Sequence, residues 1–245
     1  MTFTVLGSGT GIPTLRRGAA GYVLQVGADV LVFDCGMGTA QRMLQVGIDP
    51  VSVTHLFLSH HHPDHCADTL ALLFARLLSP PRPPLRLYGP TGTEAFLHRL
   101  VGAFPGMTAP DWAISVEESM VLQVAGDGWK VVSSPVVHGR VPAMGFRIES
   151  GGRSVVYTGD TSECSEVVTL ARGADVLLSE CSYPDDQPSP WHLTPSQVGR
   201  LATRAGVGQV VLTHLYPPCE GVDLPAQCHG SYSGPVTVAQ DLTRI

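Results

Sequence analysis

The segment at residues 59–68, SHHHPDHCAD, contains four histidines and two aspartates in ten positions. It follows the apolar run THLFLS at 54–59, which predicts a short buried strand, and it leads into a predicted helix. His60 and His62 are two residues apart, so they point to the same side if the backbone is extended. So many costly polar side chains at the end of a strand predict a metal site.

The number of metals follows from the spacing. Asp64 and His65 come directly after the two histidines. Four ligands within six residues can serve two ions but cannot all reach one. Imidazole suits zinc, iron and manganese, and a carboxylate beside it favours a hydrolytic ion over a structural one. No cysteine is needed, which argues against a zinc finger.

Further ligands are predicted at the ends of later strands. His138 follows KVVSSPVV, Asp160 follows RSVVYTG and His214 follows QVVLT. Taken singly, a histidine at a strand end is more often satisfied by hydrogen bonds, and a Gly-Asp-Thr turn is more often a helix cap. The H-x-H-x-D-H cluster favours ligation, because two ions that share a carboxylate require such partners.

The remaining pattern indicates an α/β chain. Apolar runs of four to seven residues predict strands, and helices are predicted at 38–46, 67–78, 92–101, 164–171 and 196–205. Thr194, Pro195 and Gln197 form the start signal of the last helix. Strands in hairpin-like series and strands alternating with helices predict mixed sheets. No low-complexity linker interrupts residues 1–245, so one domain is expected.

An internal echo suggests two similar halves. DVLVFDCGMGT and RSVVYTGDTSE are both apolar strands that end in a turn with Asp and Gly, and THLFLSH and QVVLTHL both end in Ser/Thr-His. We therefore expect two β/α layers that face each other, with their strand ends meeting at one edge. Ligands bind at that edge in α/β folds.

Charge and hydropathy narrow the class of partner. The 245 residues carry a net charge of −6, which provides no basic field for a polyanion, so nucleic-acid binding is not expected. The N-terminus lacks a basic region, and no apolar run reaches the roughly 18 residues that span a bilayer. A cytoplasmic protein with no membrane association is expected, and six scattered cysteines are read as free thiols.

The chain resembles the metallo-β-lactamase fold. HHHPDH contains that fold's H-x-H-x-D-H signature, and His138, Asp160 and His214 follow in the family's order. VLGSGTGIPTLRRGAAGYVLQ, FDCGMGT, SECSYPDD and WHLTPSQVG resemble segments of ribonuclease Z-like members. The resemblance implies an α/β fold (α+β in some schemes), a four-layer αβ/βα sandwich.

The resemblance also implies a set of ligands for two divalent ions, expected to be Zn²⁺, with Mn²⁺ or Fe²⁺ sharing the same ligands. Asp160 is expected to bridge the two ions, and Asp34 to support the histidines by hydrogen bonding. The other expected ligands are His60, His62 and His138 for one ion, and Asp64, His65 and His214 for the other.

His192 is the expected proton donor. HLT at 192–194 matches the family's His-x-Thr motif, and Glu180 matches the glutamate that orients this histidine. Asp64 is expected to hold the hydrogen of the attacking hydroxide. The alternative is that His192 only caps a helix together with Thr194. His61 occupies a position that the motif leaves free and is expected to point away from the metals.

The expected reaction is hydrolysis of a small phosphodiester by metal-bound hydroxide. Ribonuclease Z carries a tRNA-gripping arm between the ligands that match His138 and Asp160. Only 21 residues separate them here, and Met37 replaces an acidic residue. A tRNA 3′-processing endonuclease is therefore disfavoured. Hydrolysis of an aryl sulfate, a carboxylic ester or a lactone stays open. So does a metal-binding effector with little turnover.

Two further expectations concern other classes and partners. A flavodiiron-type oxidoreductase is disfavoured, because that group typically has Glu where His62 stands and carries a flavin domain. The expected substrate is a small anionic molecule or ester. A homodimer is compatible with an apolar face formed by Phe74, Leu77, Leu78 and Trp112, although core packing explains these residues equally well.

Overall fold

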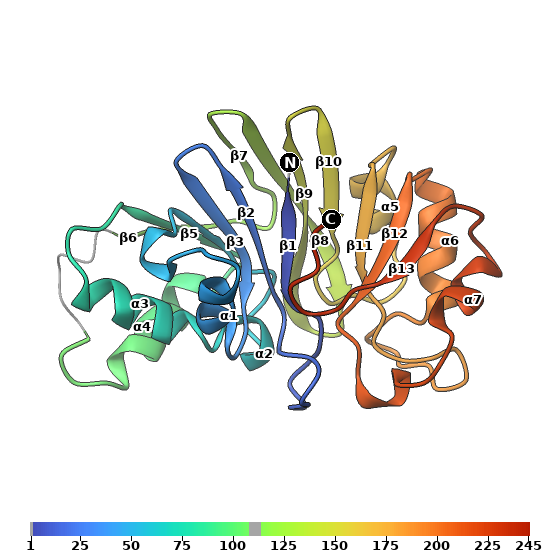
Figure 1. Ribbon diagram of the computed structural model, residues 1–245, viewed down its shortest axis with the longest axis horizontal. Helices are drawn as coiled ribbons and strands as arrows, with labels where there is room; N and C mark the ends of the chain where they lie inside the picture. The colour runs from blue at the N-terminus through green and yellow to red at the C-terminus, as the bar shows by residue number, and fades with distance from the viewer. Residues whose placement is uncertain (1, 108–113) are drawn as a thin grey trace.

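Two mixed β-sheets face each other in the computed structural model, which describes residues 2–107 and 114–245 (Figure 1). The first sheet has the order β1-β2-β3-β4-β5-β6. Pairing is antiparallel from β1 to β3 and parallel from β3 to β6. Its strands are Phe3–Gly7, Gly21–Val26, Asp29–Cys35, His55–Phe57, Leu85–Gly89 and Ile114–Glu118.

The second sheet has the order β13-β12-β11-β10-β9-β8-β7 and a similar division. Pairing is parallel from β13 to β10 and antiparallel from β10 to β7. Its strands, in chain order, are Gln123–Gly126, Trp129–His138, Val141–Ser150, Arg153–Tyr157, Val176–Glu180, Gln209–Thr213 and Val236–Val238. The two halves therefore share one plan, as the sequence echo predicts.

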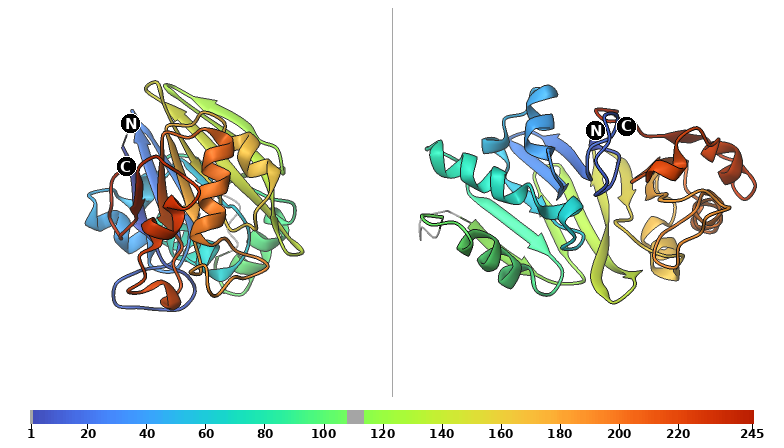
Figure 2. Two further views of the ribbon diagram at one scale, coloured as in Figure 1. Left: turned by 90° about the vertical axis from the view of Figure 1, so that its right-hand side faces the viewer. Right: turned by 90° about the horizontal axis from the view of Figure 1, so that it is seen from below.

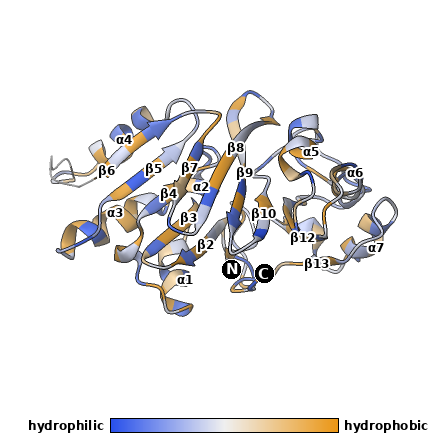
Figure 3. Cartoon of the chain, turned by 90° about the horizontal axis from the view of Figure 1, so that it is seen from above, coloured by the Kyte–Doolittle hydropathy of each residue, from blue (hydrophilic) through white to orange (hydrophobic). Residues whose placement is uncertain are grey.

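Aromatic and branched side chains fill the space between the sheets. Phe33 of β3 stacks on Phe57 of β4 at 4.9 Å between ring centroids, and its ring lies 5.7 Å from that of Phe146 in β9. All three are fully buried. The apolar inner strands are visible in Figure 3. Since alternate side chains of each strand point inward, this core joins both sheets.

Helices cover the outer face of each sheet (Figure 1). Met43, Leu72 and Val101 pack from helices onto the first sheet, and Val167 and Leu201 pack onto the second. The helices are α1 (Thr39–Gln45), α2 (Pro63–Cys66), α3 (Thr69–Leu78), α4 (Thr93–Gly102), α5 (Ser165–Ala171), α6 (Pro195–Ala205) and α7 (Leu224–His229), with 3₁₀ turns at Pro50–Ser52 (η1) and Pro217–Cys219 (η2). The predicted four-layer αβ/βα sandwich is confirmed.

Helix α6 shows how local signals set an element. Thr194 and Gln197 form a complete capping box, and Pro195 occupies the first turn, where no partner for its nitrogen is required. Gly206 ends the helix in the left-handed conformation at φ 65°. This fixed start determines where the preceding loop, which carries His192, ends.

Several elements were not predicted from the sequence. Strands β6, β7 and β13 are short edge strands, and β6 and β7 are mostly exposed, so they lack the apolar runs of interior strands. Helices α2 and α7 have four and six residues, too few to show a helical period. The predicted helix at 67–78 begins at Thr69.

The exposure of the proposed apolar face and the length of the helices concern the expected homodimer and the expected lack of membrane association. Phe74 and Leu78 are 48% and 66% exposed, whereas Leu77 is half-buried. Trp112 lies outside the described residues. Among the residues that the structure describes, no helix is both long and apolar enough to cross a membrane.

Phe33→Ala tests the inter-sheet core. Removing a fully buried ring should lower the free energy of unfolding by about 3–5 kcal/mol, because both transfer free energy and packing are lost. Chemical denaturation measures this. Phe74→Ala is the matched control, and its half-exposed ring should cost less than about 1 kcal/mol. Equal losses in the two variants would contradict the assigned core.

Candidate metal centre

The carboxyl ends of strands from both sheets meet at one edge of the molecule, drawn at the bottom of Figure 1 and facing the viewer in the right-hand panel of Figure 2. Asp34 stands near the end of β3, and His138 ends β8. The predicted residues from His60 to His65 follow β4, and Asp160 follows β10. Glu180 ends β11, His192 lies on the loop after it, and His214 follows β12. The two sheets bring together residues up to 180 positions apart, from Asp34 to His214.

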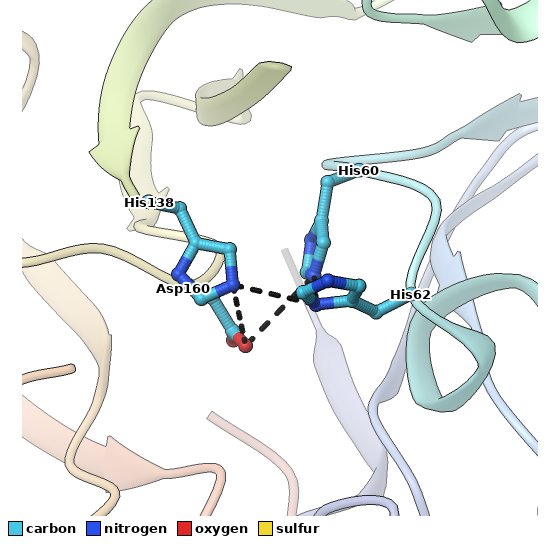
Figure 4. Close-up of side chains that lie close together, drawn as sticks. All are labelled: His60, His62, His138 and Asp160. Atoms are coloured by element: carbon cyan, nitrogen blue, oxygen red, sulfur yellow. Dashed lines mark hydrogen bonds and ion pairs between the residues drawn. The ribbon is translucent and has the colours of Figure 1, made fainter. Parts of the chain in front are cut away.

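One donor group combines both sheets. His60, His62, His138 and Asp160 each direct one ligand atom to a common point, and these atoms all lie within 4.8 Å of one another. Figure 4 shows the four side chains converging from their separate elements. His60 Nε2 is 2.9 Å from His62 Nδ1, and His138 Nε2 is 3.3 Å from that same atom.

A second donor group lies beside the first. Asp64, His65 and His214 place ligand atoms within 4.8 Å of one another. Asp160 stands between the groups. Its Oδ1 is 3.3 Å from His65 Nε2 and 3.5 Å from His214 Nε2, while its Oδ2 faces the first group, 3.9 Å from His60 Nε2. Each oxygen therefore serves a different group, as a bridging carboxylate requires.

The donor atoms fit divalent ions. Nitrogens bound tetrahedrally at about 2.0–2.1 Å stand about 3.3–3.4 Å apart, and the nitrogens here are 2.9–3.3 Å apart. Asp160 Oδ1 is buried yet makes no hydrogen bond among the described residues. A buried charged oxygen without a donor is costly, so a cation is the partner this arrangement fits.

Burial and neighbouring side chains together set the charge of His60 and Asp160. It lowers the pKa of His60 well below its ordinary value, which keeps the imidazole neutral and able to ligate. Burial alone would raise the pKa of Asp160, but the adjacent His214 and His65 outweigh it and hold that pKa well below its ordinary value. The site therefore presents a neutral imidazole at His60 beside an ionised carboxylate at Asp160. At His65, burial lowers the pKa, but the charges of Asp160 and Asp34 outweigh it and raise that pKa well above its ordinary value.

His192 lies at the rim of the same cluster. Its Nδ1 is 3.0 Å from Glu180 Oε1 and 3.9 Å from Asp160 Oδ2. Burial lowers the pKa of His192, but the hydrogen bond and charge of Glu180 outweigh burial, so the pKa lies above its ordinary value. Glu180 is fully buried, and the backbone N–H groups of Thr161 and Leu193 also donate to its carboxylate.

This geometry has a known counterpart. The family model described as "Beta-lactamase superfamily domain" matches residues 30–215, a span that contains every predicted site residue. The chain belongs to this family. It is a hydrolase of the metallo-β-lactamase fold, and that fold implies divalent metal ions.

Relatives and solved structures agree with the assignment. The chain is 32% identical over 271 positions to a ribonuclease Z from Mycolicibacterium gilvum (strain PYR-GCK), covering 99% of this chain and 94% of the relative. The metallo-β-lactamase fold protein YhfI from Bacillus subtilis superposes with a TM-score of 0.86 at 26% identity, covering 100% and 98%. The short form of human tRNase Z gives 0.82 at 24%, with the same coverage.

In this metallo-β-lactamase-fold chain, Asp34 anchors the donor groups from behind. Its carboxylate accepts hydrogen bonds from His65 Nδ1 at 2.7 Å, from the Ser59 backbone N–H at 2.6 Å and from the Ser59 hydroxyl at 2.7 Å. The Tyr157 hydroxyl donates to it from the other sheet at 2.6 Å. Engaging Nδ1 of His65 leaves Nε2 free to face the ions.

Two serines extend this support. The Ser59 hydroxyl donates to Asp34, so it accepts from His60 Nδ1 at 3.0 Å. The Ser182 hydroxyl likewise donates to Glu180 Oε2 at 2.7 Å and accepts from His214 Nδ1 at 3.0 Å. Each half of the molecule thus contains a carboxylate–serine–histidine chain that directs Nε2 of one histidine into the cluster.

Sequence analysis missed Ser59, Ser182 and Tyr157. Ser59 directly precedes His60 and Ser182 follows Glu180 by two positions, so their closeness to predicted site residues was a usable signal. Tyr157 has no local signal, because its partner lies in the other sheet. Asp34 and His214 have positive φ, 55° and 56°, which non-glycine residues seldom adopt and which is found at functional sites.

The remaining residues at this edge take other roles. His61 points away from the donor groups, as expected: its Nε2 contacts Thr93 Oγ1 at 2.9 Å and its ring stacks on Phe96. Arg17 is held by Glu220 and by the carbonyl of Ala239. It is therefore engaged within the protein rather than free for a substrate.

Ser182→Ala tests the support of His214. Losing this hydrogen bond should weaken zinc affinity by roughly 10–100-fold, because the imidazole is no longer held in the ligating tautomer. Competition with a chelating dye measures the affinity. Ser179→Ala is the matched control: Ser179 is buried in β11, three residues before Ser182, and its hydroxyl bonds only the Glu180 carbonyl. Unchanged affinity in Ser182→Ala would contradict the role.

Proposed function

We propose that this protein is a dinuclear, zinc-dependent phosphodiesterase that acts on a small phosphodiester. The observation that carries the proposal is the place of Asp160, with one oxygen toward each donor group and His192 beside it. Imidazole-rich donors with carboxylates suit zinc, and manganese and iron share them. When bound, two such ions supply Lewis acidity and lower the pKa of a water molecule toward neutrality.

We assign the proposed ligands to two groups, one for each ion. His60, His62 and His138 would hold one ion, and Asp160 would be shared. Asp64, His65 and His214 would hold the other. Asp64, which is 12% exposed at its side chain, is in addition the proposed acceptor for the hydrogen of the attacking water.

His192 is the proposed general acid. Glu180 engages Nδ1, so the proton available to a substrate is on Nε2. A histidine that is held in this way can protonate an alkoxide as it departs, which is the difficult part of cleaving an alkyl phosphodiester. Glu180 positions the ring and does not touch the substrate. Thr194 caps helix α6 independently, so capping does not require His192.

The substrate is proposed to be small. Only the β9–β10 hairpin lies between His138 and Asp160, and its turn consists of Gly151 and Gly152. The segment therefore has no room for a long arm. The net charge of −6 offers no field that would attract RNA. The alignment with the mycolicibacterial relative spans 271 positions although this chain has 245 residues, so that relative has residues with no counterpart here.

A second candidate is cleavage of precursor tRNA at its 3′ side. It is favoured by the name ribonuclease Z carried by the mycolicibacterial relative. Incubating the metal-loaded protein with precursor tRNA and, separately, with small diesters separates the candidates. Cleavage of the precursor at a rate far above that of the small diesters would replace the first proposal with the second.

Hydrolysis of bis(p-nitrophenyl) phosphate tests the proposed function. Activity should disappear on chelation and return with zinc or manganese. Asp160→Asn should lose more than the roughly 10–100-fold that outer hydrogen-bond partners contribute, because charge shared by both ions is removed. No turnover by protein shown to be metal-loaded would overturn the phosphodiesterase. Aryl sulfates, carboxylic esters, lactones and an effector role would then be tested.

His192→Ala separates catalysis from helix capping. With an alkyl leaving group, kcat should fall by about 10²–10⁴-fold, because an alkoxide requires a proton as it leaves. With p-nitrophenolate, which departs as a stable anion, the loss should be below about tenfold. Steady-state kinetics on both diesters gives the comparison. Equal losses on both substrates would mean that His192 is not the acid.

A further inference from the structure

Three rings form a compact group at the rim of the metal centre. Tyr183, on the loop after β11, stacks on Tyr216, on the loop after β12, with 5.0 Å between centroids and 12° between planes. The His192 ring lies 6.1 Å from Tyr183 and 5.9 Å from Tyr216. The Tyr216 ring also lies 5.8 Å from His214. The tyrosine pair is therefore a direct neighbour of the proposed acid.

Packing of the fold does not account for this pair. Tyr22, Tyr157 and Tyr232 are buried, and each bonds its hydroxyl to another residue. Tyr183 and Tyr216 are only half-buried, and neither hydroxyl has a hydrogen-bond partner among the described residues. Large rings that stand half-exposed beside a reactive group present apolar surface to whatever enters.

The residue that precedes His192 is also aromatic. Trp191 is 58% exposed. Its carbonyl accepts from His138 Nδ1 at 3.1 Å, and its ring lies over Gly139, where a Cβ would come within 3.3 Å of the indole.

The proton path places the leaving group against these rings. To be protonated, the leaving oxygen must come within about 2.6–3.2 Å of His192. The atoms attached to that oxygen then lie beside Tyr216 and Tyr183. Flat rings stack favourably on tyrosine in offset or edge-to-face arrangements, and saturated groups gain less.

We propose that Tyr216 and Tyr183 form a leaving-group subsite that takes a flat aromatic ring, such as the base of a nucleoside or an aryl group. The proposal rests on the proposed function, since it requires that His192 protonates the departing alcohol. It makes the tyrosine pair the determinant of which alcohol leaves, while the donor groups hold the phosphate.

Two matched diesters test the subsite. Methyl 2-phenylethyl phosphate and methyl 2-cyclohexylethyl phosphate have leaving alcohols of similar size and acidity, but only one ring is flat. The wild type should release phenylethanol with kcat/KM about three- to tenfold higher than cyclohexylethanol, in line with aromatic pair energies. Tyr216→Leu should bring this ratio close to one, and Tyr216→Phe, which keeps the ring, should retain it.

A binding measurement keeps the outcomes separate. Calorimetry of the zinc-loaded protein with 2-phenylethyl phosphate and 2-cyclohexylethyl phosphate should show the same Tyr216-dependent preference without turnover. Hydrolysis of both diesters at equal kcat/KM overturns the subsite and leaves the phosphodiesterase standing. No hydrolysis of either, together with no turnover of bis(p-nitrophenyl) phosphate, overturns the phosphodiesterase. A calorimetric ratio near one overturns the aromatic site, whether or not the diesters are hydrolysed.

A third diester identifies the kind of ring. Methyl adenosine 5′-phosphate carries a nucleoside as its leaving alcohol. A kcat/KM above that of the phenylethyl ester assigns the subsite to nucleosides, and a lower value assigns it to simpler aryl alcohols. A value no higher than that of the cyclohexylethyl ester excludes nucleosides.

Discussion

The carboxylate of Asp34 is the interaction on which the rest of the structure depends. It is fully buried, and a buried charge is tolerated only where donors surround it. Those donors come from both sheets: Ser59 and His65 from the first, and Tyr157 from the second. Hydrogen bonds to this one carboxylate therefore hold the two sheets in position relative to each other, at the edge where the metal ligands are proposed to lie. Any shift between the sheets would leave that charge without part of its hydrogen bonding.

The second half of the molecule has a similar buried carboxylate, Glu180, which has an additional role. Glu180 is buried like Asp34. The Ser182 hydroxyl connects Glu180 to His214 by hydrogen bonds, as the Ser59 hydroxyl connects Asp34 to His60. Glu180 differs in that it also holds His192. The first half thus only supports the donor groups, whereas the second half supports them and supplies the proposed acid. An asymmetry of this kind lets two similar halves divide metal binding and proton delivery between them.

The outer edge of the site determines what can react there. The hairpin between His138 and Asp160 is short, and the ring pair of Tyr183 and Tyr216 lines the side from which the leaving group is proposed to depart. Loops carried by a rigid scaffold often hold the residues that determine binding. Here two of these loops carry tyrosines beside the site and the hairpin between His138 and Asp160 is short, which agrees with a small substrate.

Most of the strands, most of the helices and the types of donor residue could be predicted from the sequence. HHHPDH and the polar residues that end later strands predicted both groups of side chains that converge, since apolar runs and their ends are local features. It did not reveal β6, β7 or β13, which lack an apolar run, or Tyr157, whose partner is in another sheet. The resemblance already implied a bridging role for Asp160, but the folded structure was required to show that the Tyr157 hydroxyl reaches Asp34 from the other sheet. Such contacts depend on how two sheets pack, and no spacing along one chain encodes that distance.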